Sequence, residues 1–466
     1  MKDVIVMTEN IWFHWERNAT FTPIFMCMEA WGQPTAKYWG VSWPTTICVW
    51  KNDIISWNNK NQDFYEMGKI LVENFLKNGW GKFEDEINET AIKITKFMRE
   101  CNPIADMSEH ELVRKFKELH NLWIHWFVLG VTEPPGVYGE KILEELSKDK
   151  KNFSLLTSPI RKSFSRREFE DLLQVKNDKE LENHAKKYFW LHNNYFTTET
   201  ISKEFFQDEL KKLREKYSDS ANYLNEVERN DKELLVEKEK IMNQLNFSER
   251  EKKLVTLMEF FAWFQDYRKE YTMQMLHYLD KILEAIGKIH GLSLKEMKHV
   301  LPEEILNNKI DRNLIRERME HFMVIWDSDR AKFELILDTD EIEQKKKQIF
   351  GEKQQTKEII EIEGQIASKG RLKGRAFVTM SAHDAKNIKP GEILVTSMTS
   401  PDFIVAIKRA AAIVTNEGGI LCHAAIVSRE FGIPCIVGTQ NATRLIKNGD
   451  LIEVDGNHGF VRILKN

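Results

Sequence analysis

The sequence predicts a multidomain chain in which a large, mainly α-helical N-terminal region precedes a compact C-terminal α/β domain. Glycine and tryptophan divide the chain: half of the 22 Gly follow residue 363, and all 13 Trp lie at or before Trp326. No Gly occurs between Gly139 and Gly287, and Pro159 is the single Pro of that stretch. A segment of this length without helix breakers indicates long helices.

Apolar residues within the glycine-free stretch recur every three or four positions, which is the spacing of a helix with one buried face. Residues 203–251 are instead rich in Lys and Glu with sparse Leu, a composition typical of an exposed or coiled-coil-like helix pair. The helical stripe consists of Leu254, Leu257, Met258, Phe261 and Phe264.

The first 80 residues have a different composition, because eight Trp lie there together with three Pro. Residues 46–50 have the composition of a strand, so we expect a small mixed subregion in this part of the helical region. The Trp side chains either fill a core or line an apolar cavity for a ligand, since ligand pockets are largely apolar and aromatic. The sequence leaves both interpretations open.

The polar stretch 341–361 is the predicted linker or hinge, so the helical region covers residues 1–340 and the α/β domain residues 362–466. Its first part, Glu341–Lys357, offers little apolar area to hold it against a domain, although an ordinary charged helix end remains the alternative. Beyond it, short β runs separated by Gly alternate with helical stretches, the pattern of a compact α/β domain. We expect strands at 375–379, 392–396, 411–415, 435–437, 451–454 and 460–464, and helices at 402–409 and 423–431.

Composition and charge narrow the class of protein. A net charge of −4 lacks the basic excess that nucleic-acid binding requires. No apolar run is long enough to span a bilayer, and the first residues lack the segments of a signal peptide. The five Cys are few and unclustered, so neither a zinc site nor a disulfide framework is expected. We expect no other metal site either. These features favour a cytoplasmic protein without nucleic-acid or membrane partners.

The segment from Thr415 to Pro434 contains the candidate catalytic residue, His423. Gly418 and Gly419 follow a predicted strand and permit a sharp turn, and His423 then begins a predicted helix. The positive end of a helix dipole opposes protonation of an imidazole but favours a bound phosphate. The placement therefore suits a neutral nucleophile that later bears a phosphoryl group. A helix-capping or surface His is the alternative.

This segment resembles the signature of the PEP-utilising enzyme mobile domain, TxxGGxxxHAAIxxRExGIPxxxG. The domain occurs in phosphoenolpyruvate synthase, pyruvate phosphate dikinase and rifampicin phosphotransferase. Similar features extend the resemblance over about residues 362–466. The matching residues are Thr415, Gly418, Gly419, His423, Ala424, Ala425, Ile426, Arg429, Glu430, Gly432, Ile433, Pro434 and Gly438.

The resemblance implies a swivelling α/β phosphohistidine domain in which His423 is phosphorylated and moves between two distant sites. It also implies that Thr415, Gly418, Gly419 and Arg429 position the His or its phosphate. Family transfers use Mg²⁺ with ATP, because magnesium neutralises charge on the phosphates.

The ATP-grasp domain of ATP-dependent family members is not recognisable here, because residues 1–340 are helical and glycine-poor and contain no GxxxxGK[ST] loop. The PEP/pyruvate barrel that follows the mobile domain in the synthase is not found either. We therefore expect ATP and Mg²⁺ to bind a separate ATP-grasp protein that acts in trans.

A helical region followed by a mobile domain is similar to the last two domains of rifampicin phosphotransferase, in which the helical domain binds the acceptor. Arg268 and His192 are candidates for binding a small-molecule acceptor, although an ion-paired Arg and a core His are the alternatives. The sequence thus predicts a phosphotransferase component that carries a phosphoryl group on His423 to an acceptor held by the helical region. The alternative is a phosphohistidine carrier or regulatory protein without acceptor chemistry of its own.

Overall fold

The computed structural model describes residues 12–51, 53–101, 103–216, 220–327, 330, 332–350, 361–399, 401–419 and 422–464. The chain divides into two compact units that are each discontinuous in sequence. One unit combines Met1–Tyr138 with Leu279–Gln355, and the other combines Gly139–Tyr278 with Thr356–Asn466. This division differs from the predicted one, in which residues 1–340 formed a single region.

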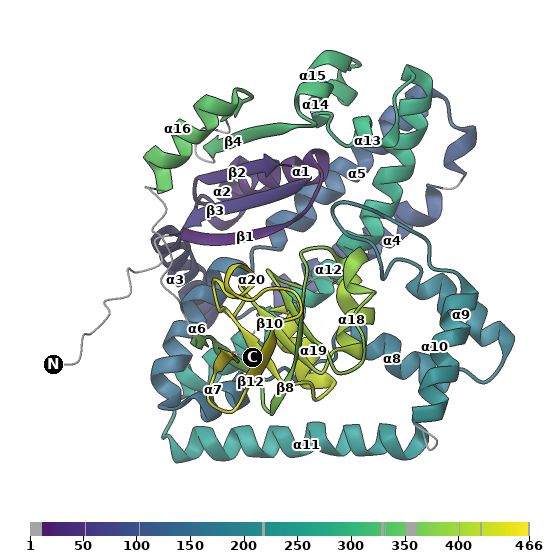
Figure 1. Cartoon of the computed structure of the whole chain (residues 1–466). Helices are drawn as coiled ribbons and strands as arrows, with labels where there is room; N and C mark the ends of the chain where they lie inside the picture. Colours follow the sequence, from purple (N-terminus) through teal and green to yellow (C-terminus); the bar gives the residue numbers. More distant parts are fainter. Residues whose placement is uncertain are drawn as a thin grey trace. The chain divides into compact units, whose positions relative to one another are not determined.

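The first unit contains a five-stranded antiparallel sheet in the order β1-β3-β2-β4-β5. The mixed subregion predicted in the first 80 residues supplies only three of these strands. The other two come from beyond residue 320, and Thr46 of β2 pairs with Trp326 of β4. The strands are β1 (Trp12–Asn18), β2 (Thr46–Lys51), β3 (Ile54–Lys60), β4 (His321–Asp327) and β5 (Lys332–Ile336) (Figure 1).

Tryptophan side chains fill the core of this first unit. Trp31 stacks on Trp43 with ring centroids 4.2 Å apart, and Trp50 and Trp57 are almost completely buried. Of the two interpretations that the sequence left open, the core is therefore the one that these side chains adopt. The surrounding helices are α1 (Phe21–Trp31), α2 (Gln33–Trp39), α3 (Asn61–Asn78), α4 (Gly81–Glu100), η1 (Ile104–Asp106), α5 (Glu109–Leu129), α13 (Leu294–Met297), α14 (Pro302–Leu306) and α15 (Arg312–Glu317).

The first half of the predicted linker is a helix rather than an irregular connection. Helix α16 spans Thr339–Phe350 and buries Ile342 in an apolar cluster that includes Met323 of β4. Ile349 and Phe350 of the same helix pack against this cluster. These few apolar residues recur at helical spacing, which is enough to hold one face of a charged helix against a sheet. The second half, residues 351–360, lies outside the described residues, so a hinge there stays a prediction.

Long helices form the first part of the second unit, as the glycine-free stretch predicted. The apolar stripe from Leu254 to Phe264 is buried on α12, a helix of 42 residues. The lysine- and glutamate-rich stretch forms α10 and α11, the helix pair expected there. The helices are α6 (Glu133–Ser147), α7 (Lys150–Leu156), α8 (Phe164–Gln174), α9 (Asp178–Tyr188), α10 (Lys203–Lys216), α11 (Ser220–Gln244) and α12 (Glu249–His290).

The C-terminal part of the second unit is an eight-stranded mixed sheet in the order β6-β13-β12-β8-β9-β10-β11-β7. Strands β8, β9, β10 and β11 are parallel neighbours, and α18 and α19 connect β9 to β10 and β10 to β11 (Figure 1). Its elements are β6 (Glu361–Glu363), β7 (Gln365–Ser368), β8 (Arg371–Val378), α17 (Ala382–Ala385), β9 (Ile393–Thr396), η2 (Pro401–Phe403), α18 (Ile404–Arg409), β10 (Ala412–Thr415), α19 (His423–Glu430), β11 (Cys435–Val437), α20 (Ala442–Leu445), β12 (Leu451–Asp455) and β13 (Phe460–Ile463).

All six strands predicted in this domain are present within a few residues of their expected bounds, and both predicted helices are present. The edge strands β6 and β7 were not predicted, since each is only three or four residues long. The predicted fold class, a large helical region followed by a C-terminal α/β domain, is confirmed. Within the described residues, no helix has the length and apolarity that crossing a membrane requires.

Candidate functional site

His423 is the first residue of α19, directly after the turn that leaves β10. The preceding residue, Cys422, is the N-cap and its side chain makes no capping hydrogen bond. The site therefore combines the carboxyl end of a strand, a helix N-terminus and an imidazole, as the sequence predicted. Backbone N–H groups at such an end lack helical partners and attract anions.

The glycine pair allows this turn to approach its neighbours closely. Gly418 has a φ of +95°, and a Cβ at this position would lie 2.7 Å from Cys422 Sγ. A Cβ on Gly419 would lie 2.1 Å from a carboxylate oxygen of Glu140 on α6. Gly418 therefore disfavours a side chain for both a conformational and a steric reason, whereas a Cβ on Gly419 would require the Glu140 carboxylate to move.

The two ring nitrogens of His423 have different surroundings. Nδ1 lies 3.0 Å from Thr399 Oγ1, whereas Nε2 is buried and has no hydrogen-bond partner among the described residues. A proton on Nδ1 can be donated to Thr399, and Nε2 then keeps its lone pair. The opposite tautomer would leave a buried N–H without an acceptor, which is rare in folded proteins. The geometry thus favours Nε2 as the nucleophilic atom.

The imidazole of His423 is held in its neutral form. Its side chain is 2% exposed, and its ring stacks on Phe164 of α8 with centroids 6.0 Å apart. Burial lowers the pKa of His423 well below its ordinary value, and the positive charge of Lys269 on α12 lowers it further. A neutral imidazole whose Nε2 keeps its lone pair can act as a nucleophile. Lys269 supplies a positive charge that acts on this ring.

The other residues predicted to position phosphate have structural contacts in this state. Thr415 is buried, and its Oγ1 donates to the carbonyl of Glu417 at 2.6 Å. Arg429 donates from Nε to the carbonyl of Ala367 and from Nη1 to that of Thr157, at 2.8 and 3.1 Å. It lies six residues beyond His423, about 9 Å along the helix. A phosphate-positioning role for Thr415 or Arg429 therefore stays a prediction.

Helix α8 with its N-cap and the segment that follows α9 contact the C-terminal sheet domain near His423. Ser163, the N-cap of α8, donates from its backbone N–H to Glu430 at 3.1 Å and also donates from its hydroxyl to that carboxylate. Lys408 Nζ lies 3.2 Å from Glu168 Oε2, and Asn194 donates to Asp402 at 2.7 Å. These contacts hold the face that presents His423 against the start of α8.

Two carboxyl groups, the buried Asp266 and the partly buried Glu430, meet at the start of α8. Asp266 of α12 accepts a hydrogen bond from the backbone N–H of Phe164 at 2.7 Å, next to the Ser163–Glu430 contact. Burial, together with the charge of Glu430, raises the pKa of Asp266 to about 7. Burial also raises the pKa of Glu430 to about 7, although hydrogen bonds from Ser163 oppose the shift. Both groups therefore exchange protons near neutral pH.

Both predicted acceptor residues are buried in the second unit. Arg268 is buried on α12. His192 is buried, and its Nδ1 lies 2.5 Å from Glu199, which also accepts from Lys386 at 3.0 Å. Burial lowers the pKa of His192, and Lys386 contributes to this shift. Acceptor binding by these residues stays a prediction.

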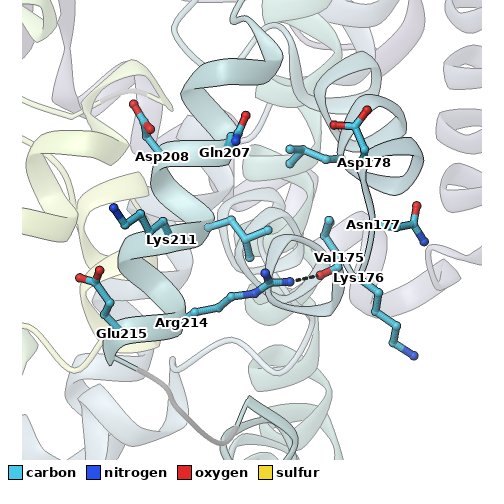
Figure 2. Close-up of a pocket in the computed structure, with 11 residues that line it drawn as sticks. Val175, Lys176, Asn177, Asp178, Gln207, Asp208, Lys211, Arg214 and Glu215 are labelled. Atoms are coloured by element: carbon cyan, nitrogen blue, oxygen red, sulfur yellow. Dashed lines mark hydrogen bonds between the residues drawn. The ribbon is translucent and has the colours of Figure 1, made fainter.

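A cavity of about 760 Å³ lies between α10 and the segment that joins α8 to α9. Figure 2 shows Gln207, Asp208 and Lys211 on α10, with Arg214 hydrogen-bonded to the carbonyl of Val175. Three cationic and three carboxylate side chains line it, so their formal charges cancel, and neither Arg268 nor His192 is among them. The charged residues are Lys176, Lys211, Arg214, Asp178, Asp208 and Glu215.

Sequence reasoning did not identify Thr399, Phe164 or Lys269 as site residues. Thr399 lies within residues 362–466, the part of the chain that the resemblance covers, so a signal for it existed. Phe164 and Lys269 lie in the helical region, 259 and 154 residues before His423, where the local sequence carries no sign of this contact.

Comparison with known proteins assigns the C-terminal segment to a family. Residues 388–459 match the model of the PEP-utilising enzyme mobile domain, which confirms the predicted resemblance. A probable phosphoenolpyruvate synthase of Methanothermobacter thermautotrophicus is 50% identical over 106 residues, which cover 23% of this chain and 15% of the relative. The phosphoenolpyruvate synthase of Pyrococcus furiosus is 54% identical over 100 residues, which cover 22% and 12%.

The matched segment is also similar to part of a protein that is not named a phosphoenolpyruvate synthase. Chondramide synthase of Chondromyces crocatus is 46% identical over 104 residues, which cover 22% of this chain and 3% of that protein. A solution structure of an Enzyme I protein covers 63% of this chain and 82% of its own, at 14% identity and a TM-score of 0.18, which is too low to support an argument. This chain thus spans only a small share of the curated relatives' length, and their names do not identify its acceptor.

Proposed function

We propose that this chain, with a PEP-utilising enzyme mobile domain at its C-terminal end, is a phosphotransferase component that works through phospho-His423. It carries the phosphoryl group on Nε2 and delivers it to a small-molecule acceptor bound by the helical region. The ATP-binding domain, with its Mg²⁺, is supplied in trans by a separate ATP-grasp protein. The proposal combines a family assignment that covers residues 388–459 with the geometry of one histidine.

The observation that carries the proposal is that the two ring nitrogens of His423 differ: Nδ1 bonds to Thr399, whereas Nε2 has no partner among the described residues. In the phosphorylation step, the Nε2 lone pair attacks phosphorus while the bond from phosphorus to the donor oxygen breaks. The ring becomes positively charged, and its Nδ1–H donates to Thr399 Oγ1, 3.0 Å away. Backbone N–H groups at the start of α19 and the ammonium of Lys269 offset the charge of the phosphoryl oxygens.

The contacts of α8 with the sheet domain support an acceptor site in the helical region. Phe164 stacks on His423, and residues of α8 or its N-cap bond to Glu430 and Lys408. The imidazole of His423 therefore lies against α8, so we place the acceptor next to this helix.

A labelling experiment tests the proposal. The purified chain is incubated with β-labelled ATP, γ-labelled ATP or labelled phosphoenolpyruvate, with and without a candidate ATP-grasp protein. We expect acid-labile phosphate at His423 only when the ATP-grasp protein is present. The variant H423A should take up no label, and H458A, which alters an exposed His of the same domain, should be labelled normally.

Two results would contradict parts of this proposal. Label that survives in H423A would exclude His423 as the carrier. Efficient labelling of the isolated chain by ATP would show that the nucleotide site lies within this chain. Release of the label to a purified protein, and never to a small molecule, would instead favour the alternative function, a phosphohistidine carrier.

A further inference from the structure

Two buried polar atoms without hydrogen-bond partners lie on groups that contact the same residue, Phe164. Among the described residues, neither His423 Nε2 nor Asp266 Oδ1 has a partner. His423 is 2% and Asp266 is 3% exposed. A buried polar atom without a partner costs about 1–3 kcal/mol, so two of them on groups that both contact Phe164 require an explanation.

Phe164 connects the two groups. Its ring stacks on the His423 ring with centroids 6.0 Å apart, and its backbone N–H donates to Asp266 Oδ2 at 2.7 Å. This hydrogen bond fixes one carboxylate oxygen and leaves Oδ1 available. The hydroxyl of Ser165, the next residue on α8, is also buried and also lacks a partner. A molecule with a hydroxyl group could satisfy such atoms, since a hydroxyl both donates and accepts.

We propose that Asp266 is a catalytic base that removes the proton from a hydroxyl-bearing acceptor, an alcohol or a phenol, as the phosphoryl group leaves His423. This inference rests on the proposed function, because it requires phospho-His423 as the donor. It names the acceptor class that the helical region would bind and the residue that would activate it.

The step balances in atoms and electrons. The acceptor O–H gives its proton to the Asp266 carboxylate, and the acceptor oxygen forms a bond to phosphorus. The bond between phosphorus and Nε2 breaks, and its electron pair returns to Nε2. The ring becomes neutral again and keeps its proton on Nδ1, next to Thr399. No oxidant, reductant or further reactant is required.

The charges around Asp266 suit this role near neutral pH. The groups that face it are Glu430 of α19, Lys269 on its own helix, Arg167 of α8 and the N–H of Phe164. Burial is the largest influence and raises the pKa of Asp266 to about 7, and Glu430 acts in the same direction. Catalytic bases work best when their pKa lies near the operating pH.

The test uses the full chain loaded at His423 with phosphoramidate, a small chemical donor of phosphoryl groups. Loading is measured by ³¹P NMR, the donor is removed, and transfer to water, glycerol and phenol is followed from pH 5.5 to 8.5, a range of about 1.5 pH units either side of the expected midpoint. The variant D266N keeps an oxygen that accepts from Phe164 but cannot take a proton. E259Q is the control, since Glu259 is a partly buried carboxyl group on α12 that pairs with Lys238 and has a pKa that burial raises.

We expect transfer by the wild type to rise with pH around a midpoint near 7. D266N should load normally, transfer about 100-fold more slowly and lose the pH dependence. D266E should restore part of the rate, and E259Q should match the wild type. Transfer by D266N at the wild-type rate, or loaded wild-type protein without pH-dependent transfer to any hydroxyl, would overturn the inference. If phosphoramidate phosphorylates free imidazole but not His423 of the wild type, the proposed function is rejected. The role of Asp266 as a base is then rejected as well.

Discussion

At the scale of single residues, the proposed chemistry depends on which nitrogen of His423 carries the proton. Thr399 lies 3.0 Å from Nδ1, and Nε2 has no partner in the described part of the chain. This one hydrogen bond selects the tautomer, because a buried N–H at Nε2 would be unsatisfied. Thr399 is therefore a positioning residue whose effect on the reaction acts through the imidazole.

Replacing Thr399 by Val tests this selection. The change keeps the size of the side chain but removes the hydroxyl, so the two tautomers become closer in energy and Nδ1 loses its partner. We expect the rate of His423 phosphorylation to fall about 10-fold or more, in line with a lost hydrogen bond of about 1.5 kcal/mol or more. T399S, which keeps a hydroxyl, should stay close to the wild type. ¹⁵N NMR of the ring should show a shift toward the Nε2–H tautomer in T399V alone.

The carboxyl groups of Asp266 and Glu430 predict how stability varies with pH. Burial raises the pKa of each to about 7 in the folded chain, above the ordinary values of 3.8 and 4.5. The folded state therefore binds more protons than the unfolded state between about pH 4 and 7. Their contribution is fully present below pH 4 and is lost as pH rises through 7.

Urea unfolding at pH 5 and pH 8, either side of these pKa values, checks this behaviour. We expect the free energy of unfolding of the wild type to decrease as pH rises through this range, with D266N and E430Q each reducing the decrease. An equally steep decrease in both variants would show that other groups cause it.

At the scale of secondary-structure elements, the turn between β10 and α19 requires glycine at Gly418. Its φ of +95° is unfavourable for other residues, and a Cβ would overlap Cys422. Gly432, after the same helix, also has a positive φ of +64°, but a Cβ there would meet nothing within 4 Å. The two positions thus separate the cost of backbone strain from that of a steric clash.

We expect G432A to destabilise the chain by about 1 kcal/mol, the cost of a left-handed conformation. G418A should cost more, about 3 kcal/mol, because strain and overlap act together. Denaturant unfolding of both variants measures the difference. Equal losses would mean that the turn relaxes to accept the methyl group.

At the scale of the whole molecule, ion pairs of different burial hold the sheet domain of the second unit to its helices. Glu168 and Lys408 have side chains that are 3% and 20% exposed, and the ammonium also lies 5.4 Å from the centre of the Phe169 ring. Glu199 and Lys386 are 51% and 31% exposed. The first pair should therefore contribute more to docking than the second, since solvent screens an exposed pair.

The variants K408M and K386M compare these two pairs. K408M leaves the Glu168 carboxylate buried beside His184 alone, so we expect a loss of about 3 kcal/mol in the free energy of unfolding. K386M should cost about 1 kcal/mol or less. Hydrogen exchange of α8 and α18 should become faster in K408M first. A larger effect from K386M would show that burial does not decide which contact holds the domain.

Local sequence patterns determined much of this protein. Helical spacing on α12, the β runs after residue 361 and the glycine pair before His423 depend on neighbours in the chain, so the sequence alone predicted them. Pairing across long distances was not predictable in this way. The strands β4 and β5 complete a sheet begun by residues 12–60, and α16 follows from contact of Ile342 with that sheet. These contacts stabilise the strands and the helix only in the folded chain, where segments distant in sequence come together.

The same distinction applies to the site. The sequence determined His423, its helix and the turn before it, because backbone conformation and a local motif encode them. Only the tertiary structure decided that Phe164 lies against the ring, that Thr399 bonds its Nδ1, that Lys269 acts on its charge, and that Asp266 binds the backbone of Phe164. Burial and the charges of distant residues lower the pKa of His423 and raise that of Asp266. These shifts depend on surroundings that no local stretch of sequence contains, and therefore only the folded chain produces them.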